Sequence, residues 1–180
     1  PYTDRQGILR YPSLLISLEL EVFHRKMDSM IGEQVHRSKV RCVLPFLTTL
    51  PEGSQLDFPQ RSGFVEIQNA LFLFVNMPKN QQHARSYPNK WLEDGQILTW
   101  FIRANQWNGG TSSLAKKLQA TSDQPTVVSL FVRTGKGDFI CCGRCRVVSL
   151  KKVSFKVEPE EEWNLVTLHL MLLDWTTLQE

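Results

Sequence analysis

The chain has 180 residues, of which 42% are hydrophobic, 10% aromatic and 22% charged, and its formal net charge is +3. This length suits one domain that buries an apolar core without disulfides or metals, and the composition excludes a disordered or fibrous chain. No apolar run approaches the ~20 residues that a membrane span needs, so we expect a soluble protein with no membrane partner. The sequence begins at Pro1 without a methionine or a signal segment, so we expect an excised or processed fragment that lacks its targeting information.

The net charge hides an uneven distribution. Residues 1–78 are balanced, residues 79–156 hold thirteen basic against four acidic residues, and residues 157–180 hold six acidic and no basic ones. A basic stretch of this kind is expected on a face that binds a polyanion, although solvated surface balanced by the acidic tail would give the same count.

The N-terminal part predicts a helix and then a strand. Apolar residues recur at helical spacing from Leu14 to Met30, with Ser13 as the candidate cap and Gly32 as the candidate end. From Val40 to Pro45 the residues alternate as in a strand. We therefore expect residues 1–38 to form a helical lead-in to a β-rich part over residues 39–175.

The rest of the chain predicts mainly strands. Alternating or continuous apolar runs mark seven more of them: Phe64–Gln68, Ala70–Val75, Gln96–Ala104, Thr126–Arg133, Phe139–Leu150, Ser154–Val157 and Asn164–Leu173. The fourth and fifth should form a hairpin through the Gly135–Asp138 turn, and residues 77–90 should form a long loop. Thr111–Gln119 predicts a short helix capped by Thr111 or Ser112. Together these elements predict one α+β domain over residues 1–180. We expect a mostly antiparallel β-barrel or strongly bent sheet with an N-terminal helix and a short helix in the middle.

Enzyme motifs are weak. Cys142 and Cys145 have the spacing of zinc ligands but lack a second pair, so we expect reduced, partly buried cysteines. No phosphate loop or nucleophile motif is present, and the acids of the basic stretch, such as Asp123 and Asp138, stand apart. We expect no cofactor and no metal, and we lean against an enzyme; a nuclease is the least favoured alternative.

Aromatic and basic side chains are interleaved between residues 85 and 107, and this pattern favours nucleic-acid binding, because aromatics stack on bases while cations neutralise phosphates. The candidate base-binding residues are Tyr87, Trp91, Trp100, Arg103, Asn105 and Trp107. Core packing is the favoured alternative role for Trp100, whereas the glycine turn beside Trp107 predicts an exposed indole. The candidate phosphate-binding residues are Lys90, Lys116, Lys117, Arg133, Lys136, Arg144 and Arg146. We expect Lys116 and Lys117 on the exposed side of their helix.

The segment SLFVRTGKGDFICCGRCRVVSL, with ILTWF and FLFVNMPKN before it, resembles a domain of unknown function (DUF3427) found at the C-terminus of some helicase-like restriction proteins. The resemblance covers roughly Leu71 to Leu150. Trp100 matches the family tryptophan, and the hairpin matches at Leu130, Phe131, Val132, Arg133, Phe139 and Gly143. The family's polar stretch after the tryptophan is replaced here by Phe101-Ile102-Arg103. The resemblance implies a small β-barrel of the PUA/SRA-like kind, which reads modified bases.

These observations predict a non-enzymatic nucleic-acid-binding domain, with DNA favoured over RNA, that reads a modified or flipped base. The alternative is a protein-interaction or structural module that contacts other domains of its parent protein. We expect it inside the cell, in the nucleus of a eukaryote or otherwise in the cytoplasm.

Overall fold

The computed structural model describes the backbone of residues 2–3, 9–11, 20–38, 40, 55–56, 63–67, 69–78, 89–119, 126–158 and 161–179. Side chains are described in the same ranges except for residues 2–3, 9–11, 55–56, 153–158 and 161–164. The helices are α1 (Leu20–Asp28), α4 (Ala104–Trp107), α5 (Ser113–Leu118) and α6 (Trp175–Gln179), with 3-10 turns η3 (Glu93–Gly95) and η4 (Asn108–Gly110). None of the described helices has the length and apolar character that a membrane-spanning helix requires.

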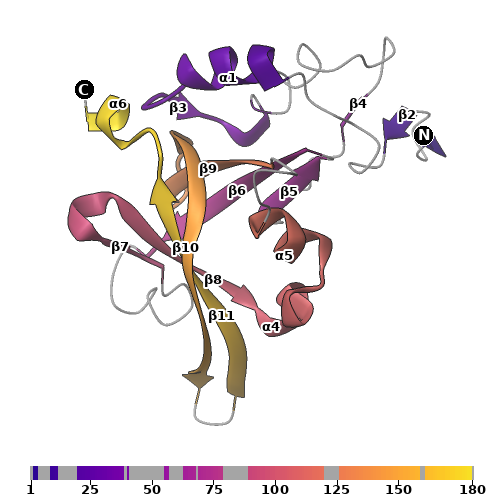
Figure 1. Cartoon of the computed structure of the whole chain (residues 1–180), viewed down its shortest axis with the longest axis vertical. Coiled ribbons are helices and arrows are strands. Elements are labelled where there is room, and N and C mark those ends of the chain that lie inside the picture. Colours follow the sequence, from indigo (N-terminus) through magenta and orange to yellow (C-terminus); the bar gives the residue numbers. More distant parts are fainter. Residues whose placement is uncertain are drawn as a thin grey trace.

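Most of the described chain is β-structure (Figure 1). A small sheet has the order β1-β2-β4, and the main sheet has the order β5-β6-β9-β10-β11-β8-β7, with β3 pairing with β10. The strands are β1 (Tyr2–Thr3), β2 (Leu9–Tyr11), β3 (Gln34–Val35), β4 (Gln55–Leu56), β5 (Phe64–Ile67), β6 (Ala70–Met77), β7 (Lys90–Leu92), β8 (Ile97–Arg103), β9 (Val127–Thr134), β10 (Phe139–Glu158) and β11 (Glu161–Leu172).

The main sheet is open, so the predicted closed barrel is wrong and only the bent sheet is confirmed. Its edge strands β5 and β7 pair with β6 and β8 and not with each other. The bend lies in β10, which pairs with β9 up to Arg144 and with β11 from Cys145 onward. A bulge between Cys141 and Arg144 marks the change of partner, and Gly143 has a φ of +77° there, a conformation that glycine adopts without strain. One long strand therefore belongs to both halves of the sheet.

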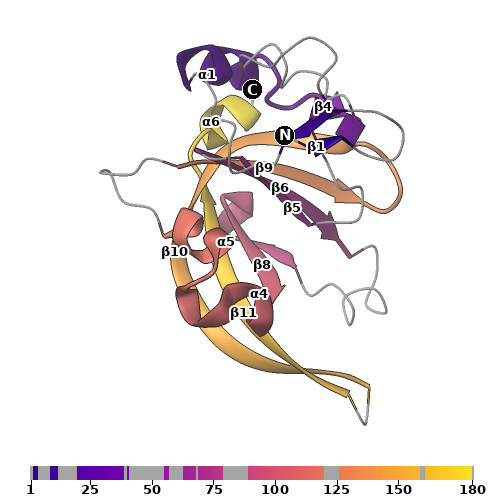
Figure 2. The same cartoon turned by 90° about the vertical axis from the view of Figure 1, so that its right-hand side faces the viewer.

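Two apolar cores lie on the two sides of β6. Leu71, Leu73 and Val75 face a core enclosed by the bent sheet and closed by α4 and α5. Phe72 and Phe74 face a second core beneath α1, whose Phe23 is fully buried. Figure 2 shows α1 above β6 and β9, with α4 and α5 on the other side of those strands. The prediction of a strand buried on both faces is confirmed by this arrangement.

Local patterns predicted most of the described elements. The β9–β10 hairpin is confirmed, and α5 is confirmed with Ser112 as its cap, because the Ala115 amide donates to Ser112 Oγ over 3.1 Å. The N-terminal helix begins at Leu20 in the described chain; Ser13 lies outside it. Val40 is helical, contrary to the predicted strand, and residues 41–45 are not described.

The last two strands are longer than predicted. Residues 154–157 belong to β10 rather than to a separate strand, and β11 begins at Glu161. β10 and β11 pair from Cys145–Leu172 to Glu158–Glu161, whereas β8 pairs with β11 only between Leu165 and Met171. The far end of the β10–β11 hairpin therefore projects from the sheet as a two-stranded ribbon, as both views show (Figures 1 and 2).

Candidate nucleic-acid interface

One side of the β7-β8-β11-β10 half-sheet faces the enclosed core, and the other side, here called the outer face, faces away from it. Side chains alternate between the two sides along β8. Leu98, Trp100 and Ile102 belong to the core, so the residues between them lie on the outer face. Residues paired directly across antiparallel strands share a face. The register therefore places four rows on the outer face: Leu92–Ile97–Met171–Arg146, Lys90–Thr99–His169–Ser149, Phe101–Thr167–Lys151, and Arg103–Leu165.

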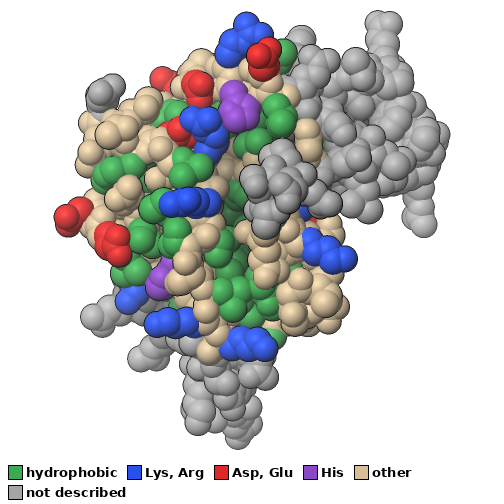
Figure 3. Space-filling view, viewed as in Figure 1, with side chains coloured by type: hydrophobic (Ala, Val, Ile, Leu, Met, Phe, Trp, Pro, Cys, Tyr) green, Lys and Arg blue, Asp and Glu red, His purple; other side chains and the backbone are tan. Residues whose placement is uncertain are grey.

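The outer face is basic. Four exposed cations lie on three of its four strands: Lys90 on β7, Arg103 on β8, and Arg146 and Lys151 on β10. No Asp or Glu occurs in these rows. Figure 3 shows Lys and Arg side chains without acids over the lower part of the described surface, in the region where Figure 1 places β10 and β11. Carboxylates flank the face instead of entering it, with Glu93 and Asp94 in the β7–β8 turn. This is the arrangement that attracts an anionic chain to one limited area.

Polar groups lie among these cations. His169 Nδ1 and Ser149 Oγ are 2.8 Å apart in a hydrogen bond across β10 and β11. Thr99 Oγ1 donates to the Lys90 carbonyl over 3.1 Å and accepts from the Lys90 amide over 2.8 Å, which fixes the edge strand β7. Thr167 Oγ1 is buried and has no hydrogen-bond partner within the described part of the chain. Thr99 and Thr167 are buried, so among these groups only Ser149 and His169 are partly exposed on the face and available to a ligand.

The face has the dimensions of a short stretch of nucleic acid. Its four rows span three two-residue steps, about 20 Å along the strands, and its four strands span about 14 Å. At 3.4 Å per base pair, the longer dimension corresponds to about six base pairs. A duplex of about twelve base pairs is therefore a sufficient probe.

Two of the predicted base-binding tryptophans lie in the core. Trp100 is 5% exposed, which agrees with its core-packing role, and Trp107 is 4% exposed, so the prediction of an exposed Trp107 is wrong. The glycine turn brings the next helix back over the indole: a β-carbon at Gly110 would lie 3.7 Å from Trp107 Nε1, and Leu114 packs in the same core. Neither indole offers an open surface to a base in this structure.

The other predicted base-binding residues are dispersed. Trp91 is 36% exposed at the edge strand and pairs with Leu98, so it lies on the side opposite to the outer face. Asn105 is exposed on α4, and Tyr87 lies outside the described residues. Arg103 alone of this group is on the outer face, two residues after Phe101 on β8.

The structure also separates the predicted phosphate-binding residues. Lys90 and Arg146 share the outer face, whereas Lys116 is exposed on α5 and Lys136 is exposed in the β9–β10 turn. Arg133 is half-buried; its Nε donates to Asn76 Oδ1 over 2.6 Å, and its guanidinium lies 4.4 Å from the centre of the Phe139 ring. Arg133 is therefore part of the packing around the turn.

Lys117 is not on the exposed side of its helix, contrary to the prediction. Its side chain is 10% exposed, and its Nζ lies 3.0 Å from Glu66 Oε2 on β5 and 2.9 Å from Ser113 Oγ. The Glu66 carboxylate comes from a segment 51 residues away, so no local pattern could reveal the pair. Lys117 holds α5 against the sheet.

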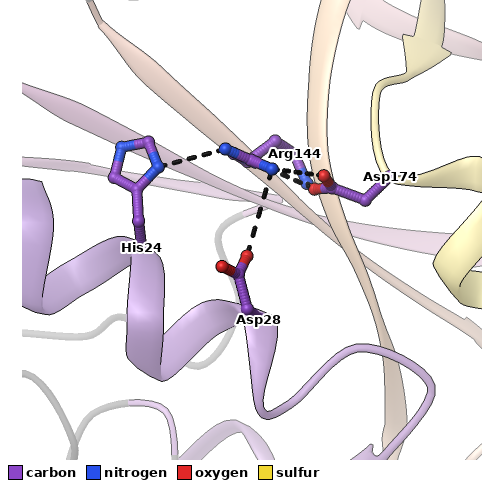
Figure 4. Close-up of polar contacts among 4 residues, drawn as sticks. All are labelled: His24, Asp28, Arg144 and Asp174. Carbon is purple, nitrogen blue, oxygen red and sulfur yellow. Dashed lines mark hydrogen bonds and ion pairs between the residues drawn. The ribbon is translucent and has the colours of Figure 1, made fainter.

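Arg144 is bound by acids of its own chain (Figure 4). Its Nε donates to Asp174 Oδ2 over 3.0 Å, its backbone amide donates to the same oxygen over 2.7 Å, and a second guanidinium nitrogen contacts Asp174 Oδ1. Its Nη1 lies 3.1 Å from His24 Nδ1, and its Nη2, the nitrogen that contacts Asp174 Oδ1, lies 4.0 Å from Asp28 Oδ1. Hydrogen bonding to Asp174 raises the pKa of Arg144. Burial alone would raise the pKa of Asp174, but hydrogen bonds from Arg144 outweigh it and lower that pKa. A phosphate could reach Arg144 only by displacing these groups.

Three of the four cysteines lie close together in the buried part of β10. Cys141, Cys142 and Cys145 are free and buried, and burial raises the pKa of Cys141 to about 11 and that of Cys142 to about 12. Among the residues whose placement is described, no three His, Cys, Asp or Glu side chains lie together as metal ligands would.

A surface hollow of about 620 Å³ lies on α1 beside Leu20, Glu21, His24 and Arg25, and none of the predicted base-binding residues is among its described lining.

Most outer-face residues were not among the predicted site residues, and Phe101, Lys151 and His169 are the exposed or partly exposed ones that the proposal uses. Lys151 belongs to the basic stretch, and its position two residues beyond Ser149 on a strand was visible in the sequence. Phe101 and His169 depend on the register between β8 and β11, which pairs segments far apart in the chain. That register brings Phe101 into the row of Lys151 and Thr167.

Comparisons with known proteins establish no family. No family model matches the chain, and no curated protein matches it either, so the resemblance to DUF3427 stays a prediction. A crystal structure of Arabidopsis thaliana SUVH6 in complex with SAM resembles 79% of this chain at 13% identity with a TM-score of 0.44. The match covers 25% of that chain, so the present sequence spans about a quarter of its length. A likeness at this level does not establish a common fold.

Proposed function

We propose that this chain is a non-enzymatic nucleic-acid-binding module that holds a phosphate backbone, of DNA in preference to RNA, against the outer face. The observation that carries this proposal is the set of four exposed cations, Lys90, Arg103, Arg146 and Lys151, in rows that contain no carboxylate. Phosphate contacts supply most of the affinity of such interfaces, and strand faces are among the surfaces that bind nucleic acids.

The finer proposal is a reader of a modified or flipped base in a PUA/SRA-like fold. Such a reader needs an aromatic side chain that stacks on the base and polar groups that meet its edge. Because Trp100 and Trp107 are core residues, we assign the stacking role to Phe101, which is partly exposed on the outer face. His169, partly exposed on β11 in the next row, is the neighbouring polar group.

The test is binding to a labelled twelve-base-pair duplex at low salt, measured by fluorescence anisotropy. Arg146→Glu with Lys151→Glu should weaken binding at least about tenfold, because two phosphate contacts become repulsive. Lys116→Glu with Lys136→Glu is the matched control, with the same change of charge at exposed positions outside the face, and should change affinity less than about threefold. Equal losses in the two variants would contradict the outer face as the binding surface.

The reader proposal needs its own comparison. The same duplex, with and without methylated cytosine or adenine, should bind with different affinity, and Phe101→Ala should remove the difference while leaving the affinity for the unmodified duplex within about threefold. Equal affinity for all duplexes would leave a general nucleic-acid binder and end the reader proposal.

A further inference from the structure

His169 lies within the outer face, with cations on either side of it. It is partly exposed on β11 and shares a row with Lys90 of β7 and Ser149 of β10. Arg146 and Lys151 of β10 occupy the rows before and after it, so each is a diagonal cross-strand neighbour at about 7–8 Å between α-carbons. A phosphate that either of these long side chains holds would therefore lie within reach of the imidazole.

The four rows of the outer face surround His169 with positive charge only. On β8 the nearest charged side chain is Arg103, two rows away, and no carboxylate occurs in any of the rows. The acids Glu93 and Asp94 lie in the turn beyond the next row. A bound phosphate would be the only negative charge in these rows, so it favours the imidazolium over the neutral ring.

A hydrogen bond to Ser149 holds the imidazole in place without fixing its charge. His169 Nδ1 and Ser149 Oγ are 2.8 Å apart. A hydroxyl both donates and accepts, so Ser149 donates to an unprotonated Nδ1 and accepts from the Nδ1–H of the imidazolium. Nε2 makes no hydrogen bond within the described part of the chain. Gaining a proton therefore costs no hydrogen bond, and it leaves an Nε2–H that can donate to a bound phosphate oxygen.

We propose that His169 is a proton-linked phosphate contact: the neutral ring takes one proton from the solvent as nucleic acid binds, and the imidazolium becomes a fifth cation of the outer face. The proposal rests on the nucleic-acid-binding function above and adds regulation of that site by pH. Histidine is the residue whose charge changes between pH 5 and 8, so binding should become tighter as the pH falls through that range.

The first measurement is the affinity for the labelled twelve-base-pair duplex at pH 8 and at pH 6. The association constant of wild type should rise at least about threefold at pH 6, and its salt slope should steepen by about 0.9, because one more phosphate is neutralised. His169→Gln, which cannot take up a proton, should lose both changes. His169→Arg, which is charged at both pH values, should bind at pH 8 within about threefold of wild type at pH 6.

His36 provides a matched control, because it forms the same kind of pair outside the outer face. Its Nδ1 lies 2.6 Å from Ser38 Oγ, and its side chain is exposed. His36→Gln should keep the pH dependence of wild type. If His169→Gln kept that dependence as well, the proposal would be overturned while the nucleic-acid-binding function stood. Absence of binding to wild type at both pH values would overturn the function and the proposal together.

Proton uptake supplies a second test that uses the unaltered chain. Calorimetric titration with the duplex near pH 7, in two buffers with different heats of ionisation, counts the protons taken up on binding. Wild type should take up at least about 0.3 proton per duplex bound, and His169→Gln should take up close to none. Binding without proton uptake, or equal uptake by the two proteins, would contradict the role of His169.

Discussion

Gly143 and Asp174 fit against each other only because residue 143 has no side chain. A β-carbon at Gly143 would lie 2.6 Å from Asp174 Oδ2, closer than real contacts allow, and 3.0 Å from Asp174 Cβ. The bulge at Gly143 thereby lets the Asp174 carboxylate reach both the backbone amide and the guanidinium of Arg144. This contact ties the bend of β10 to the start of α6, and through His24 and Asp28 to α1.

The first prediction concerns that close approach. Gly143→Ala should lower the free energy of unfolding by about 2–4 kcal/mol, because it adds backbone strain at positive φ to a clash with Asp174. Urea denaturation measures the change. Gly137→Ala is the control, since Gly137 has open space around its α-carbon and no positive φ, and it should stay within about 0.5 kcal/mol of wild type. Equal effects at the two glycines would show that the bulge is not constrained as described.

The second prediction uses the lowered pKa of Asp174. Asp174→Asn should cost about 2–3 kcal/mol at pH 7, a modest value for a buried carboxylate because the Arg144 side chain is 33% exposed. The folded pKa lies below the unfolded value of about 3.9, so the contribution of the pair is complete above that value and is lost as pH falls through the folded pKa.

The measurement is urea denaturation of wild type and Asp174→Asn between pH 7 and pH 2.5. The difference in stability should be constant down to about pH 4 and should shrink below it. A difference that does not depend on pH would mean that the charge of Asp174 contributes nothing to the contact.

The third prediction separates the adjacent lysines of α5. Lys117→Gln should lower stability by about 1 kcal/mol, because it removes the contact with Glu66 at a site that is nearly buried. Lys116→Gln changes the same residue type at the exposed neighbouring position and should stay within about 0.5 kcal/mol. Thermal or urea unfolding of both variants measures the two losses of stability. A larger loss of stability for Lys116→Gln than for Lys117→Gln would contradict the placement of α5.

The fourth prediction concerns the cysteines. In a Cys42→Ser background, Cys141, Cys142 and Cys145 should resist a thiol reagent at pH 8 in the folded protein, because burial keeps them as thiols and excludes the reagent. All three should react in urea, which serves as the control. Rapid labelling of the folded protein would show that the bulge region of β10 is open to solvent.

The fold was predictable where the information is local. The apolar run of β6 and the glycine turn between β9 and β10 define those strands without knowledge of their neighbours. The open sheet was not predictable in the same way, since it depends on β10 changing partners at the Gly143 bulge. Trp107 shows the other limit: a glycine turn predicts exposure, and the helix that follows it covers the indole instead.

The candidate site was predictable in charge but not in position. The excess of cations between residues 79 and 156 was evident from the sequence alone. Which of them share a face depends on the register of β7, β8, β11 and β10, and on acids that engage Lys117 and Arg144 from distant segments. Lys90 and Arg146 come together on the outer face only through three successive pairings, β7 with β8, β8 with β11, and β11 with β10.

The most direct test of the outer face is the salt dependence of duplex binding. Four phosphate contacts predict that the logarithm of the association constant falls with the logarithm of salt concentration with a slope of about −3.6. Arg146→Gln with Lys151→Gln should reduce that slope to about −1.8, while Lys116→Gln with Lys136→Gln should leave it unchanged. A slope that is the same in wild type and in the outer-face variant would contradict the account.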